Sequence, residues 1–95
     1  MSNNDLSVKV VSGSSTSFTV NANSYQDFIF AITIPDGYTP VAISAISSDT
    51  DMPIVKFSIR DTNNGIKGTI VNNYASAKTA IISGTLLCVK SSIID

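Results

Sequence analysis

Hydrophobic and polar residues alternate along most of the chain with a period of two rather than 3.6. This period predicts β-strands, because successive side chains of a strand point to opposite faces of a sheet. Each segment that shows the pattern is bounded by Gly, Pro, Ser, Asn or Asp, which favour turns. We expect strands at 6–12, 16–22, 27–34, 41–47, 54–60, 66–72 and 80–90.

The connections between these segments are short, and several have the composition of specific turns. The stretch PDGYTP at 35–40 combines a proline with fixed φ, an aspartate and a glycine. In DTNNG at 61–65, the Asn64-Gly65 pair predicts a hairpin of type I′. Short connections favour antiparallel pairing. We therefore predict one domain over 1–95, with residues 1–5 as a short lead-in. Its fold class is all-β, an antiparallel, jelly-roll-like β-sandwich of seven to eight short strands.

The alternation also predicts which side chains form the core. The strongest apolar stripe lies in 27–34 and comprises Phe28, Phe30, Ile32 and Ile34. In 54–60 the pattern predicts that Val55, Phe57 and Ile59 face inward. In 6–12 the apolar positions are Leu6, Val8 and Val10.

The last strand, AIISGTLLCVK at 80–90, is apolar on both faces, and alternation alone does not say which face is core. Loops and chain ends could cover the second face, or a second copy of the protein could cover it. Charged residues make up only 14% of the chain, so few like charges would keep copies apart. We favour a homo-oligomer. The candidate interface residues are Ile81, Leu87, Val89, Ile93 and Ile94.

The residue types needed for most catalytic sites are absent. There is no histidine or glutamate and there is one cysteine, Cys88, which excludes His-based triads and ordinary zinc sites. Asp49 and Asp51 could act as paired carboxylates, or with Asp61 and Asn63 offer oxygen ligands to calcium, but solvated loops explain all four. We predict that the protein is not an enzyme and has no cofactor, catalytic residue or metal site.

Charge and hydropathy restrict the partners. The net charge is −1 and there is no cluster of Lys or Arg, so nucleic-acid binding is not expected. No apolar run reaches the roughly 20 residues that span a bilayer, so membrane insertion is not expected either. The first residues lack the pattern of a signal peptide, and we expect synthesis in the cytoplasm.

The loops offer residues for surface contacts. Tyr25, Tyr38 and Tyr74 lie in or beside loops, where a tyrosine either stacks on a ligand or caps the core with its hydroxyl in water. A monomeric carbohydrate-binding module is therefore an alternative to the oligomer. The candidate surface-binding residues are Tyr38, Asp49, Asp51, Asn63, Asn64, Asn73 and Tyr74.

Several stretches resemble a known group of proteins. They are IPDGYTPVAI at 34–43, FSI at 57–59, VNN at 71–73 and TLLCVK at 85–90. Together they resemble the small all-β domains at the C-terminal ends of bacteriophage and prophage tail-fibre, tail-tip and baseplate proteins. The resemblance implies a homotrimeric, non-enzymatic structural protein of the virion, made in the bacterial host. It also implies contacts with host-surface polysaccharide or protein, or with other virion proteins.

Overall fold

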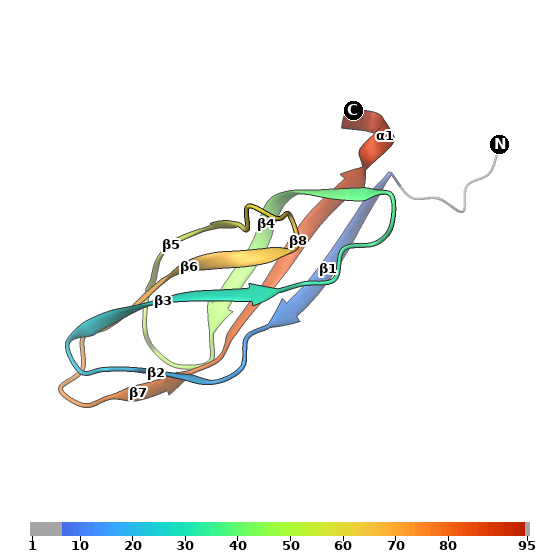
Figure 1. The fold of residues 1–95 in the computed structure, drawn as a ribbon. Helices are drawn as coiled ribbons and strands as arrows, with labels where there is room; N and C mark the ends of the chain where they lie inside the picture. Colours follow the sequence, from blue (N-terminus) through green and yellow to red (C-terminus); the bar gives the residue numbers. More distant parts are fainter. Residues whose placement is uncertain (1–6, 95) are drawn as a thin grey trace.

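The computed structural model describes residues 7–94, with the side chain of Ile94 excepted. The predicted lead-in, 1–5, lies outside the described residues. Within them the chain forms eight strands and one short helix, in the order shown in Figure 1. The elements are β1 (Val8–Ser14), β2 (Phe18–Val20), β3 (Ser24–Ala31), β4 (Tyr38–Ser48), β5 (Ile54–Ile59), β6 (Gly65–Asn72), β7 (Lys78–Ala80), β8 (Ile82–Lys90) and α1 (Ser91–Ile94).

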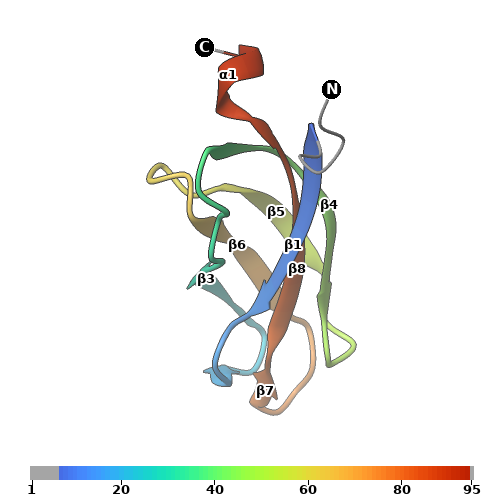
Figure 2. The ribbon, with the colours of Figure 1, turned by 90° about the vertical axis from the view of Figure 1, so that its right-hand side faces the viewer.

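The strands form three antiparallel sheets, of order β1-β8-β4, β3-β6-β5 and β2-β7. The first strand pairs with the last, the second with the seventh and the third with the sixth. These three pairings are nested within one another, whereas β4 pairs with β8 and β5 with β6. The two three-stranded sheets form the sandwich, and β2 and β7 lie at the end opposite α1 (Figures 1 and 2). The predicted all-β, antiparallel sandwich of seven to eight short strands is confirmed.

The predicted strand 80–90 is divided at Ile81, where the chain changes sheets. Before this residue β7 pairs with β2, and after it β8 pairs with β1 and β4. The main chain of Ile81 is held from the β4–β5 loop, since its N–H donates to Asp49 Oδ1 (2.8 Å) and its carbonyl accepts from Asp49 N (3.1 Å). The sequence pattern gave no sign of this change, because the apolar run continues through it.

No helix in the described part of the chain is long and apolar enough to cross a membrane.

The core lies between the two three-stranded sheets. Phe28 and Phe30 stack with ring centroids 6.2 Å apart, and Phe18 adds a further ring 6.4 Å from that of Phe28. A Cβ on Gly84 would overlap Ile66 and come within 3.2 Å of Phe30, so this glycine makes room for both side chains. The buried apolar side chains are Val20, Phe28, Phe30, Ile32, Met52, Ile66, Ile70, Ala80, Ile82, Leu86 and Cys88.

The core face predicted from alternation is correct in the segment 27–34. Phe28, Phe30 and Ile32 are buried, and Ile34 packs against the same core. The structure also decides the orientation of β8: Ile82, Gly84, Leu86 and Cys88 are buried, and the alternate residues face outward. Leu86 therefore belongs to the core, and Leu87 to the outer face.

The predicted inward faces are wrong in two other strands. In β5, Val55 is 58% exposed because it is the extra residue in the register shift between Ile54 and Lys56. Phe57 is 48% exposed because β5 is an edge strand, whereas Ile59 packs against the core as predicted. In β1, Val8 and Val10 are exposed and Val11 packs against the core. Val10 pairs with Leu87, which fixes its side chain on the outer face of the sheet.

The predicted hairpin between β5 and β6 is present, but its turn is longer than a two-residue type I′ turn. Arg60 N donates to Gly65 O (2.9 Å), so residues 61–64 form the loop. Within it, Asn63 N donates to Arg60 O (2.8 Å) and Asn63 takes a positive φ of 56°. Asn63, rather than Asn64, is the residue in the left-handed conformation, which asparagine tolerates.

Candidate functional site

The predicted surface-binding residues lie at two opposite ends of the sandwich. β4, of 11 residues, and β6, of 8 residues, each run from one end to the other. Segments 35–39 and 61–65 lie at the end near α1, and segments 48–53 and 72–77 lie at the other end (Figure 1). The seven residues therefore form two groups. The first is Tyr38, Asn63 and Asn64, and the second is Asp49, Asp51, Asn73 and Tyr74.

The first group borders an open hollow of about 520 Å³, lined by residues 31–40 together with Asn63 and Asn64. Ile32 N donates to Asn64 O (2.9 Å), which ties the segment after β3 to the β5–β6 loop. A turn closed by Tyr38 N and Pro35 O (3.1 Å), with Gly37 at φ 81°, then leads the chain into β4. The backbone alone thus defines most of this hollow.

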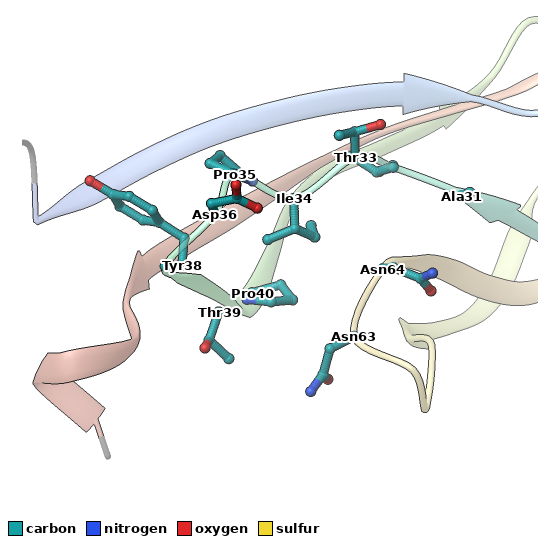
Figure 3. A pocket seen from close by; sticks show the side chains of 12 residues that line it. Ala31, Thr33, Ile34, Pro35, Asp36, Tyr38, Thr39, Pro40, Asn63 and Asn64 are labelled. Atoms are coloured by element: carbon teal, nitrogen blue, oxygen red, sulfur yellow. The ribbon is translucent and has the colours of Figure 1, made fainter.

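The side chains of the hollow are mainly apolar and amide groups. In Figure 3, Ile34 and Pro40 lie between Tyr38 and Asn64, and the ring of Tyr38 extends away from Asn64, toward β1. Lys9 of β1 places its Nζ 4.7 Å from the centroid of the Tyr38 ring. A cation over the ring occupies one of the two faces on which a sugar would stack. The hollow brings together no pair of groups suited to acid–base chemistry.

The second group is joined by polar contacts of its own. Tyr74 Oη donates to Asp51 Oδ2 (3.1 Å), and Lys78 Nζ lies 4.5 Å from the centroid of the Tyr74 ring. The hydrogen bond to Asp51, followed by the charge of that carboxylate, raises the pKa of the Tyr74 hydroxyl. Asp49 holds the main chain of Ile81, as described above. These contacts use both carboxylates for local structure, and Asn73 is exposed beside them.

The residues considered as calcium ligands are also divided. Asp49 and Asp51 follow β4, whereas Asp61 and Asn63 lie in the β5–β6 loop at the other end. Within residues 7–94 no three His, Cys, Asp or Glu side chains gather as metal ligands do. The thiol of Cys88 is buried in the core, and burial raises its pKa. A thiol with a raised pKa is a poor nucleophile at neutral pH.

The outer face of the β1-β8-β4 sheet is a continuous surface without charged side chains. Pairing places Val10 beside Leu87 and Val8 beside Val89, and Ala42 lies on the other side of Leu87. Val8, Val10 and Val41 are 44%, 61% and 45% exposed. Toward the other end the same face carries hydroxyls, and Ser12 and Thr85 share a hydrogen bond of 2.9 Å.

We call this surface the uncharged face. Its residues are Val8, Val10, Ser12, Ser14, Thr39, Val41, Ala42, Ser44, Ala45, Ser47, Ser83, Thr85, Leu87 and Val89.

The structure brings together some of the predicted interface residues and separates others. Leu87 and Val89, both half-buried, occupy the middle strand of the uncharged face. Ile81 is 37% exposed between β7 and β8, and Ile93 is 58% exposed in α1. The side chain of Ile94 lies outside the described residues. Sequence reasoning missed Val10, although two adjacent valines at 10–11 must point to opposite faces and only one can be core.

Three comparisons were made with known proteins. No family model, no curated protein and no solved structure matches the chain.

Proposed function

We propose that the protein is a non-enzymatic structural module that works as a homo-oligomer, most simply a trimer, assembled through the uncharged face. The observation that carries the proposal is a three-stranded sheet whose outer face has exposed valines at one end and hydroxyls at the other, without a charged side chain. Contiguous exposed apolar residues on a sheet often mark an interface.

The energetics favour association through this face. Burial of several hundred Å² of apolar surface is worth on the order of 10 kcal/mol before the entropy of association is subtracted. No charge on the face has to be desolvated, and Ser and Thr hydroxyls can bond across an interface. Leu87 and Val89 would lie at its centre, where contacts contribute most to binding.

A role in a bacteriophage virion is the setting that we propose for such a module. It is supported by the stretches that resemble tail-fibre, tail-tip and baseplate domains. The two ends of the sandwich would then present loops to another virion protein or to the host surface. This part of the proposal depends on analogy, and the oligomer does not.

The geometry gives less support to a monomeric carbohydrate-binding module. Of the three tyrosines considered for stacking on a sugar, Tyr25 lies in β3 and is 67% exposed, whereas Tyr38 and Tyr74 each have a lysine ammonium over one ring face. They also lie at opposite ends of the sandwich, so they cannot form one binding surface.

The experiment compares two lysine substitutions at positions of matched exposure. Val10 on the uncharged face is 61% exposed, and Ile29 on the outer face of the other sheet is 59% exposed. We expect Val10→Lys to weaken association at least a hundredfold, because each copy would bury a charge, and Ile29→Lys to leave the solution mass unchanged. Circular dichroism should show both variants folded. Equal masses for the two variants and the unmodified protein would contradict the proposal.

A further inference from the structure

β5 is an edge strand, and the described residues leave one side of it unpaired. In the β3-β6-β5 sheet its hydrogen-bonded neighbour is β6 alone. Four of its six residues are exposed, and two of these, Val55 and Phe57, are large and apolar (58% and 48%). An exposed apolar edge is a template for another strand.

The pairing register identifies which backbone groups face the open side. Arg60 N donates to Gly65 O, so Arg60 directs its main-chain groups toward β6. Hydrogen-bonded and non-hydrogen-bonded pairs alternate along an antiparallel ladder. Ser58 and Lys56 therefore also bond to β6, and the N–H and C=O groups of Phe57 and Ile59 point away from it. The backbone bonds found for residues 7–94 give these groups no partner outside the sheet.

Pairing with a further strand is blocked along one part of the β5 edge and open along another. The register shift between Ile54 and Lys56 disturbs the start of β5, which is a common way to block edge pairing. From Lys56 to Ile59 the pairing with β6 is regular. The open part of the edge is thus short, and it contains the exposed aromatic ring of Phe57.

We propose that the β5 edge pairs antiparallel with β5 of a second copy, with the twofold axis at Phe57. In this register Phe57 lies opposite its own counterpart, Val55 opposite Ile59, and Lys56 opposite Ser58. The two aromatic rings then meet across the strands, and such cross-strand pairs stabilise a sheet. The free groups of Phe57 in each copy would bond to one another.

Charge selects this register over its neighbours. An axis at Lys56 would place two lysines opposite each other, and an axis at Ser58 would place Lys56 opposite Arg60. Like charges directly opposite each other destabilise a pair of strands. The axis at Phe57 avoids both. It gives an isologous contact, in which the same strand serves both copies.

This inference goes beyond the proposed function and does not depend on it. The uncharged face belongs to β1, β8 and β4, whereas β5 lies at the edge of the other sheet. A molecule with two separate surfaces for its own copies would build assemblies larger than a single ring.

Disulfide trapping tests both the contact and its register. The Cα atoms of a hydrogen-bonded pair are about 5.5 Å apart, within the range that a disulfide spans. Full-length Phe57→Cys should therefore form a disulfide-linked dimer at least tenfold faster than full-length Val55→Cys. Val55 is the matched control, because it is apolar, similarly exposed and lies on the same strand, but it is not opposite itself. The buried thiol of Cys88 should form no dimer in the unmodified protein.

Both variants should be made on the Val10→Lys background, so that failure of the uncharged face and failure of the β5 edge can be distinguished. A fast disulfide at Phe57→Cys in that background supports the inference even if the unmodified protein is not a trimer. Equal rates at the two positions, or no dimer at either, would overturn it. Half-exposed Phe57 can be replaced without loss of the fold, which thermal unfolding would verify.

Discussion

Asn72 is a fully buried polar side chain that fixes the turn after β6. Its Nδ2 donates to the carbonyl oxygens of Val20 and Ser76, both at 3.0 Å, and its Oδ1 accepts from Tyr74 N at 2.8 Å. One amide thus joins β6 to β2 and positions Tyr74. Buried polar groups that are fully bonded in this way make a local structure unique.

Replacement of Asn72 by alanine should be costly, because it leaves the buried carbonyl of Val20 and the partly buried backbone groups of Ser76 and Tyr74 without a partner. We expect Asn72→Ala to lower the free energy of unfolding by about 2–4 kcal/mol in urea denaturation. Asn73→Ala is the control, since Asn73 is the exposed neighbour and its loss should cost at most about 0.5 kcal/mol. Equal effects would show that the bonds of Asn72 do not hold the turn.

At the scale of single residues, the sequence indicated the chemistry of the loops but not their contacts. Composition placed Tyr38 and Tyr74 in or beside loops, where the structure has them. The lysines that cover their rings, Lys9 and Lys78, come from 29 residues before Tyr38 and four residues after Tyr74. The first of these contacts depends on the pairing of β1 with β8, which no local pattern contains.

At the scale of elements, β8 shows what alternation can predict. Alternation correctly assigned its residues to two faces. The structure shows that Leu86 faces the core and Leu87 faces outward. In β5 the same reasoning failed for Val55, which is an extra residue between the paired residues Ile54 and Lys56. A bulge leaves no clear mark in a strand whose residues are mostly apolar or small.

The orientation of β8 can be tested with two adjacent leucines. Leu86 is fully buried, so Leu86→Ala should lower the free energy of unfolding by about 2–5 kcal/mol. Leu87→Ala should cost clearly less in a dissociated sample, because Leu87 is only half-buried on the outer face. Chemical denaturation of both variants at low protein concentration would measure the difference. A larger loss for Leu87 would reverse the assignment of faces.

At the scale of the whole molecule, the sequence predicted the fold class and the approximate number of strands. It did not predict the nested pairing of β1 with β8, β2 with β7 and β3 with β6. That pairing divides the candidate loop residues between two ends, and it gathers Val8, Val10, Leu87 and Val89 on one face. The division of the loop residues and the gathering of the apolar residues both depend on contacts between segments far apart in the sequence. Periodicity carries no information about such contacts.

The uncharged face makes self-association the central property of the proposed module. The first measurement should be the solution mass of the unmodified protein, by size exclusion with light scattering at two concentrations. We predict at least three chains per particle at the higher concentration, with Val10→Lys reducing that number. A particle of one chain at both concentrations would contradict the account, because the exposed valines of the β1-β8-β4 sheet would then face water.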